Sequence, residues 1–209
     1  AQKLIMDLSD KSYRKVFLQL FFNRGCLVNL QTFDGPTAKD LVINLVHDRN
    51  EDGAACLELL ADKLPKFKAN EAKDLVINLA SANVRIACLA PLLDKLPIFE
   101  ADVARDLVEE LASGWTEQKL ILEWLVKNGK LVNLSKLEGS AAQEFIIALA
   151  GKQNGRYFLQ PLLEAGKLNN LTLSADEANR VAFALIEAGD WGKEILTLLR
   201  EKGLLLPNE

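Results

Sequence analysis

A short polar segment, residues 47–53 with the sequence HDRNEDG, holds the residues best suited to bind a metal ion. Its last six residues match the opening of a calcium-binding EF-hand loop, in which oxygen ligands occupy alternate positions. Asp48, Asn50 and Asp52 would be these ligands, but the twelfth position, which needs a bidentate Glu, is Leu59. The same residue types also form polar turns and helix starts. We therefore expect no resident metal or cofactor, with these three residues as a weak calcium candidate.

The residues that catalysis usually requires are scarce in this chain. His47 is the only histidine, and no nucleophile motif accompanies it. The acidic pairs at 109–110 and 176–177 are chain neighbours, which point in different directions on a helix and so do not face each other. No phosphate-binding glycine pattern occurs. We expect that the chain is not an enzyme; an enzyme on a helical-repeat scaffold is kept as an alternative.

The three cysteines, Cys26, Cys56 and Cys88, cannot pair into a complete disulfide framework. Cys56 and Cys88 occupy matching Ala-Cys-Leu contexts. Small buried thiols are typical of such positions. We expect buried, unpaired cysteines and a cytoplasmic or other reducing compartment, which includes the interior of a host cell if the protein is delivered there.

The composition limits the classes of partner. Hydrophobic residues make up 49% of the 209 residues and charged residues 26%, which is typical of a chain with a packed core. The formal net charge is −4, whereas nucleic-acid binders cluster Lys and Arg against phosphates. No apolar run reaches the roughly 20 residues that span a membrane. A protein partner is therefore favoured, nucleic acid is disfavoured, and no membrane span is expected.

The chain repeats itself at intervals of 32 to 38 residues. The strings AKDLVINLV at 38–46 and AKDLVINLA at 72–80 differ only in their last residue. Related strings follow: ARDLVEELA at 104–112, AQEFIIALA at 142–150 and ANRVAFALI at 178–186. Their apolar spacing predicts an amphipathic helix, the first helix of each repeat. A second apolar block follows each string, at 56–64, 88–96, 120–126, 158–163 and 195–199, and predicts a second helix.

The ends of the repeats carry their own signals. Gly25, Gly129, Gly166 and Gly203 each follow a second block and precede leucines, which is typical of a left-handed helix C-cap. The two middle repeats instead end in Leu-Pro at 64–65 and 96–97, where proline stops a helix.

Helix pairs of this length cannot bury their apolar faces alone, so successive pairs must stack. The sequence therefore predicts an all-α fold, a right-handed α-solenoid of about six two-helix repeats. We expect one domain, 1–209, with repeats at approximately 1–36, 37–68, 69–100, 101–139, 140–173 and 174–209.

The two-helix unit resembles the repeats of the HEAT and armadillo class, a likeness of architecture that implies a binding scaffold. Its length is also close to that of TAL-effector repeats, in which a variable pair of loop residues reads one DNA base. His47-Asp48 resembles such a pair, but the Gly-Gly-Lys-Gln stretch of that family is not repeated, and only residues 151–153 (GKQ) are similar to it. No specific family is identified.

Stacking would align equivalent residues of successive repeats into columns. Lys39, Lys73 and Arg105 would form a basic column, and Asp40, Asp74, Asp106 and Glu144 an acidic one. Such columns are either mutually compensating surface charges or the charge pattern of a binding surface.

Aromatic residues are the other candidates, with Trp115 and Trp191 expected in interhelix loops and Tyr157 at the start of a second helix. Trp115, Tyr157 and Trp191 are of the types enriched at interaction hot spots, although each could also cover the side of the stack. We expect a non-catalytic protein–protein interaction module or scaffold; a nucleic-acid-binding repeat protein is the alternative. Modules of this kind occur in cellular scaffolds and in bacterial effectors delivered into hosts, and the sequence does not choose between these.

Overall fold

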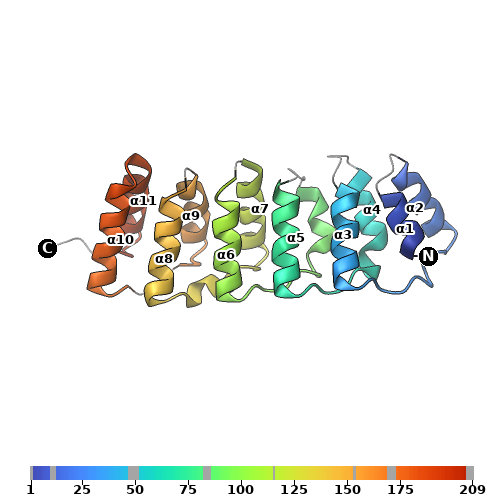
Figure 1. The fold of residues 1–209 in the computed structure, drawn as a ribbon, viewed down its shortest axis with the longest axis horizontal. Helices are drawn as coiled ribbons and strands as arrows, with labels where there is room; N and C mark the ends of the chain where they lie inside the picture. The colour runs from blue at the N-terminus through green and yellow to red at the C-terminus, as the bar shows by residue number, and fades with distance from the viewer. Residues whose placement is uncertain are drawn as a thin grey trace. The chain divides into compact units, whose positions relative to one another are not determined.

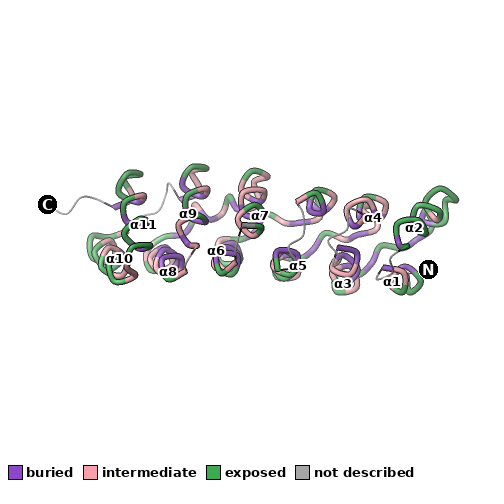
Figure 2. The backbone as a smooth tube through the Cα atoms, turned by 90° about the horizontal axis from the view of Figure 1, so that it is seen from above, coloured by how far each residue is buried: buried purple, intermediate pink, exposed green. Residues whose placement is uncertain are grey.

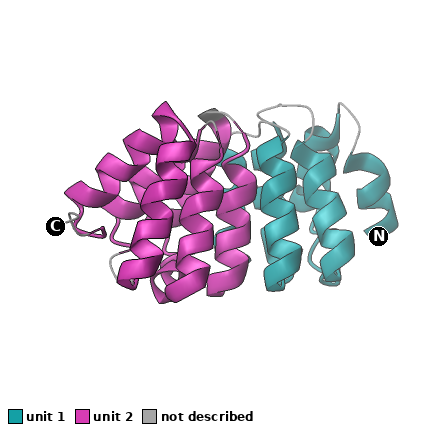
Figure 3. Ribbon diagram, turned by 60° about the vertical axis from the view of Figure 1, so that its left-hand side comes forward, with its two compact units in different colours: residues 1–97 teal, residues 98–209 magenta. Residues whose placement is uncertain are grey.

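The computed structural model describes residues 2–9, 13–46, 52–81, 86–114, 116–152, 154–168 and 173–205. Every regular element within these ranges is helical, so the all-α prediction is confirmed (Figure 1). Among the described helices, none combines the length and the apolar character that a transmembrane span requires. The chain divides into two compact units, Ala1–Pro97 and Ile98–Glu209 (Figure 3).

The N-terminal unit arranges its helices in two layers (Figure 2). First helices α1, α3 and α5 lie side by side, and α2 packs against α4 in the second layer. The elements are α1 (Gln2–Ser9), α2 (Arg14–Asn23), α3 (Gly35–Val46), α4 (Asp52–Leu60), the 3-10 turn η1 (Ala61–Lys63), α5 (Ala69–Ser81), and the 3-10 turns η2 (Ile86–Cys88) and η3 (Ala90–Leu92).

The C-terminal unit has the same two-layer plan. First helices α6, α8 and α10 form one layer, and second helices α7, α9 and α11 form the other. The elements are α6 (Ala101–Leu111), α7 (Thr116–Lys127), the 3-10 turn η4 (Val132–Lys136), α8 (Gly139–Ala150), α9 (Gly155–Glu164), α10 (Ala175–Glu187) and α11 (Asp190–Glu201).

The repeated strings form the core as their spacing predicts. In α3 the buried residues are Ala38, Leu41, Val42, Leu45 and Val46, which are spaced i, i+3, i+4, i+7 and i+8 along one helix face. The residues at the same five repeat positions are buried in the strings of α5, α6 and α8. In α10 only two of these five positions are buried.

The third repeat departs from the prediction of a second helix over 88–96. Two short 3-10 turns, η2 and η3, occupy this segment, joined by backbone bonds such as Leu92 N–H to the Leu89 carbonyl oxygen (3.0 Å). Pro91 supplies no backbone N–H, so one α-helical bond is lost there. Cys88, Leu89 and Leu92 are nevertheless buried. The apolar residues of this segment therefore reach the core from 3-10 turns rather than from an α-helix.

The glycine caps are confirmed. Gly25, Gly129, Gly166 and Gly203 have φ between 65° and 70°. After each of them the next residue donates its N–H to a carbonyl five residues earlier, for example Lys130 to Leu125 at 3.0 Å. This is the Schellman arrangement, which satisfies carbonyls at the end of a helix.

A buried phenylalanine precedes three of the first helices and ties successive repeats together. Phe33, Phe67 and Phe99 are at most 3% exposed. Each donates its backbone N–H to the carbonyl of a lysine near the end of, or shortly after, the following second block: Lys63, Lys95 and Lys130, all at 2.9 Å. Each first helix therefore enters the stack at a fixed point.

Candidate interaction surface

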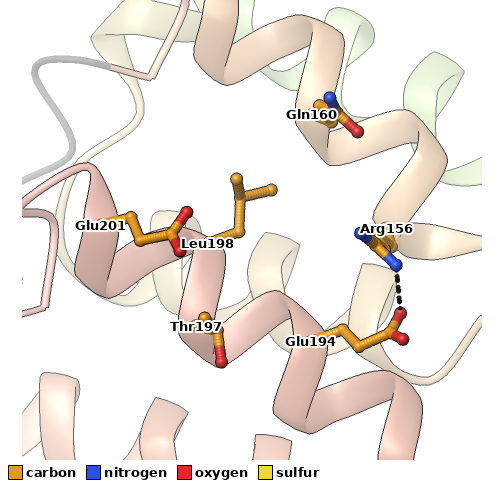
Figure 4. A pocket seen from close by; sticks show the side chains of 6 residues that line it. All are labelled: Arg156, Gln160, Glu194, Thr197, Leu198 and Glu201. Atoms are coloured by element: carbon orange, nitrogen blue, oxygen red, sulfur yellow. Dashed lines mark hydrogen bonds and ion pairs between the residues drawn. The ribbon is translucent and has the colours of Figure 1, made fainter.

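An open groove lies between second helices α9 and α11 of the C-terminal unit. Its volume is about 330 Å³. Six side chains line it (Figure 4): Arg156 and Gln160 from α9, and Glu194, Thr197, Leu198 and Glu201 from α11. The lining is mostly polar and carries charges of both signs.

Two glycines bring the walls of the groove into place. Gly155 and Gly192 lie in the first turns of α9 and α11 and are buried. A Cβ on either would overlap the backbone carbonyl of Leu149 in α8 or Leu185 in α10. Each second helix therefore starts in backbone contact with the last turn of its first helix, an approach that only glycine permits. Gly53 holds α4 against α3 in the same way, where a Cβ would lie 2.7 Å from the Leu45 oxygen.

Hydrogen bonds fix most of the polar side chains of the groove. Arg156 Nη1 lies 2.8 Å from Glu194 Oε2, an ion pair that joins the two walls. Gln160 Nε2 donates to Glu164 Oε1 on its own helix at 2.8 Å, and the Thr197 hydroxyl donates to a backbone carbonyl of α11. The Leu198 side chain and the Glu201 carboxylate point into the open space (Figure 4). The groove therefore offers an apolar contact and a carboxylate to a ligand.

Two of the predicted aromatic residues lie on the helices that form the walls of this groove, although neither is among its six lining residues. Tyr157 and Trp191 are each 43% exposed. Trp191 precedes Glu194 by one helical turn and so lies on the same side of α11 as a groove residue, whereas Tyr157 is directed toward α7. Lys119 Nζ of α7 lies 6.0 Å from the centre of the Tyr157 ring, within reach of a cation–π contact.

The predicted setting of Trp191 in a loop is wrong, because this residue belongs to the first turn of α11. A helix start immediately after Gly189, whose φ is 76°, accounts for the difference. Trp115 lies outside the described residues.

The predicted charge columns consist largely of compensated charges. Lys39 Nζ lies 3.7 Å from Asp74 Oδ2 on the neighbouring first helix. Arg105 lies 3.2 Å from Asp106 and 3.8 Å from Glu109, all on α6. Lys73, Asp40 and Glu144 lie on the first helices at the predicted repeat positions. Because opposite charges lie in contact, these residues offer a partner little electrostatic potential of one sign.

The calcium candidate is only partly described, since Asp48 and Asn50 lie outside the described residues, as does His47. Asp52 begins α4, and its Oδ1 accepts a hydrogen bond from Lys15 Nζ at 2.8 Å. Within the described ranges, no group of three His, Cys, Asp or Glu residues is placed to hold a metal ion.

The cysteines differ in exposure. Cys56 and Cys88 are buried as predicted, and burial raises the pKa of the Cys56 thiol to about 11. Cys26 is exposed, which corrects the prediction for this residue. It directly follows Gly25 in a C-cap turn, where its backbone N–H donates to Phe21 O at 2.8 Å and its Sγ lies 4.0 Å from Arg24 O.

Glu109 is the remaining acid of interest, on α6. Desolvation by burial raises the pKa of Glu109, opposed by the nearby Arg105 guanidinium. Neither Glu109 nor Cys56 lines the groove between α9 and α11.

None of the six residues that line the groove was predicted from sequence. Their one signal is periodic: polar residues at i, i+3 and i+7 on the outward side of a predicted second helix, such as Glu194, Thr197 and Glu201. Comparison with known proteins gives no further guide, since no family model, no curated protein and no solved structure matches this chain.

Proposed function

We propose that this chain is a protein–protein interaction module that holds a segment of a partner protein in the groove between α9 and α11. The observation that carries the proposal is an open groove of about 330 Å³ whose two walls, α9 and α11, each also carry a half-exposed aromatic residue, Tyr157 and Trp191. Aromatic residues beside a recess are typical anchors of protein interfaces, because they contribute large contact areas at little conformational entropy.

The charges of the groove favour a protein segment over nucleic acid. Among the described residues that line the groove, Arg156 is the one cation and is paired with Glu194, and Glu201 adds a further negative charge. A phosphate backbone would meet net repulsion there, whereas the Lys, Arg or backbone N–H groups of a peptide could donate to Glu201. Leu198 offers a small apolar contact between these polar groups.

The architecture that goes with this proposal is a right-handed α-solenoid of two-helix repeats resembling the HEAT and armadillo class. The parallel layers of first and second helices in each compact unit support it, as does the recurrence of buried positions in the strings of α3, α5, α6 and α8. Such scaffolds present rows of second helices, and grooves between them, to their ligands.

The test compares proteins retained from a native lysate by the immobilised chain and its variants. Tyr157→Ala and Trp191→Ala remove the two anchors, and Phe22→Ala removes an exposed aromatic residue of α2, far from the groove in sequence and in the other compact unit. We expect specific proteins to be retained by the wild type and by Phe22→Ala and lost from both groove variants. Circular dichroism should show the same helicity in all four proteins.

Two results would contradict the proposal. If all variants retain the same proteins, the groove is not the binding surface. If the retained material is removed by nuclease, the chain binds nucleic acid. A retained protein that passes both controls can be titrated directly, because burial of Trp191 should shift its fluorescence to shorter wavelength.

A further inference from the structure

The neutral polar side chains of the groove between α9 and α11 donate their hydrogen bonds to the chain itself. Gln160 donates through Nε2 to Glu164 Oε1 at 2.8 Å, and the Thr197 hydroxyl donates to the Lys193 carbonyl oxygen at 2.9 Å. An amide or a hydroxyl that donates in this way still has an oxygen that accepts. These two side chains therefore offer a ligand acceptors rather than donors.

The carboxylates of the groove add further acceptors and an excess of negative charge. Glu194 accepts a hydrogen bond from Arg156 at 2.8 Å, so these two charges compensate each other. Glu201 brings a second carboxylate, which forms no ion pair with another described residue and points into the open space (Figure 4). The described lining thus leaves one negative charge without a counterion. A cation that donates hydrogen bonds is the ligand that complements it.

The size of the groove and its apolar contact narrow the choice of cation. A volume of about 330 Å³ lies at the small end of the range for ligand sites, roughly 300–1,000 Å³. One long side chain therefore fits it better than a whole element of secondary structure. The Leu198 side chain points into the same space. It offers an apolar surface to the aliphatic stem of a Lys or Arg, which such residues bury while their charged ends meet polar groups.

We propose that the groove binds an arginine side chain of the partner segment, an inference that rests on the function proposed above. The guanidinium forms two parallel hydrogen bonds with the Glu201 carboxylate, and its stem lies against Leu198. Arginine fits better than lysine because its planar head has five N–H donors and no acceptor, so it also bonds to neighbouring acceptors such as the Thr197 oxygen. Glu201 is accordingly the residue that determines specificity.

An NMR titration of the isotope-labelled protein with capped tripeptides tests this contact. The probe is acetyl-Ala-Arg-Ala-amide, and two matched peptides replace its arginine by lysine or by citrulline, which has the shape of arginine without the charge. We expect the arginine peptide to shift the backbone amide signals of Thr197, Leu198 and Glu201. Its Kd should be on the order of 1 mM, because one side chain carries the contact. The lysine peptide should bind more weakly, and the citrulline peptide should give no saturable shift.

Two substitutions with the same change of charge separate the groove from the overall charge of the protein. Glu201→Gln keeps the size of the side chain and removes the carboxylate that lacks a counterion. It should weaken binding of the arginine peptide about tenfold or more, the loss expected for a hydrogen bond to a charged group. Glu187→Gln changes an exposed acid of α10 that does not line the groove, and it should bind the peptide as the wild type does. Both side chains are exposed, and circular dichroism should show equal helicity.

Three results would overturn the assignment of an arginine. The first is binding of the citrulline peptide as tight as that of the arginine peptide, and the second is a Glu201→Gln variant that binds as tightly as the wild type. The third is tighter binding of free L-arginine than of the tripeptide, which would make the ligand a small molecule rather than a protein segment.

The titration and the lysate experiment fail separately. If retained proteins depend on Tyr157 and Trp191 but the arginine peptide does not bind, the proposed function stands and the arginine is wrong. If the arginine peptide binds through Glu201 but no retained protein depends on the groove variants, the arginine site stands and the proposed function is contradicted.

Discussion

Replacing Gly155 by Ala should destabilise the C-terminal unit, because the new Cβ overlaps the Leu149 carbonyl at the end of α8. Relief requires α9 to move away from α8, and overpacking of this kind costs about 1–3 kcal/mol. Ala gains about 0.5–1 kcal/mol over Gly in a helix, which offsets part of the cost. The middle values of these two ranges leave a net loss of about 1 kcal/mol. For a chain of this size it lowers Tm by about 2–5 °C.

Gly151→Ala is the matched control for this substitution. Gly151 lies in the same connection between α8 and α9, its φ is −70°, and a Cβ there would lie 3.6 Å from the nearest backbone oxygen, an ordinary contact. Thermal unfolding followed by circular dichroism should leave this variant within about 0.5 kcal/mol of the wild type, as for other surface substitutions. Equal melting of the two variants would refute the argument that glycine sets the approach of α9 to α8.

Three further predictions concern the caps, the core and the thiols. Hydrogen bonds from Thr37 lower the pKa of Asp34. The decrease in Tm caused by Asp34→Ala should therefore be largest at neutral pH and become smaller as the pH falls below about 4, through the lowered pKa. A decrease in Tm that stays the same at low pH contradicts this. Phe99→Ala empties a fully buried site and should cost about 3–5 kcal/mol in chemical denaturation, and a loss under 1 kcal/mol would show that the site is not core. A thiol reagent should label only Cys26 in the native protein and all three cysteines in denaturant, since burial and a pKa of about 11 protect Cys56; rapid native labelling of all three would contradict the packing.

The first helices could be predicted from sequence because their signal is local. Five apolar positions recur within nine residues of each string, and the same five are buried in the strings of α3, α5, α6 and α8. The glycine caps could also be predicted, because a position with positive φ directly after a helix favours glycine.

The second helices were harder to predict because their form depends on tertiary contacts. Pro91 and Pro161 hold the same repeat position, yet α9 continues through Pro161 while the segment around Pro91 forms 3-10 turns. A proline alone therefore does not decide the backbone form there. The roles of Gly155 and Gly192 were also missed, because a close approach between two helices leaves no periodic trace in either one.

The candidate groove arises from one property of the repeat. A cation at a single position reaches from one second helix to the next, and its effect depends on the residue that receives it. Between α2 and α4 the partner is Asp52, between α7 and α9 it is the Tyr157 ring, and between α9 and α11 it is Glu194. Only the last of these contacts forms part of the groove wall, with Arg156 and Glu194 meeting across it. At Lys193 the same repeat position makes an ion pair within α11, where Nζ lies 3.1 Å from Asp190 Oδ1.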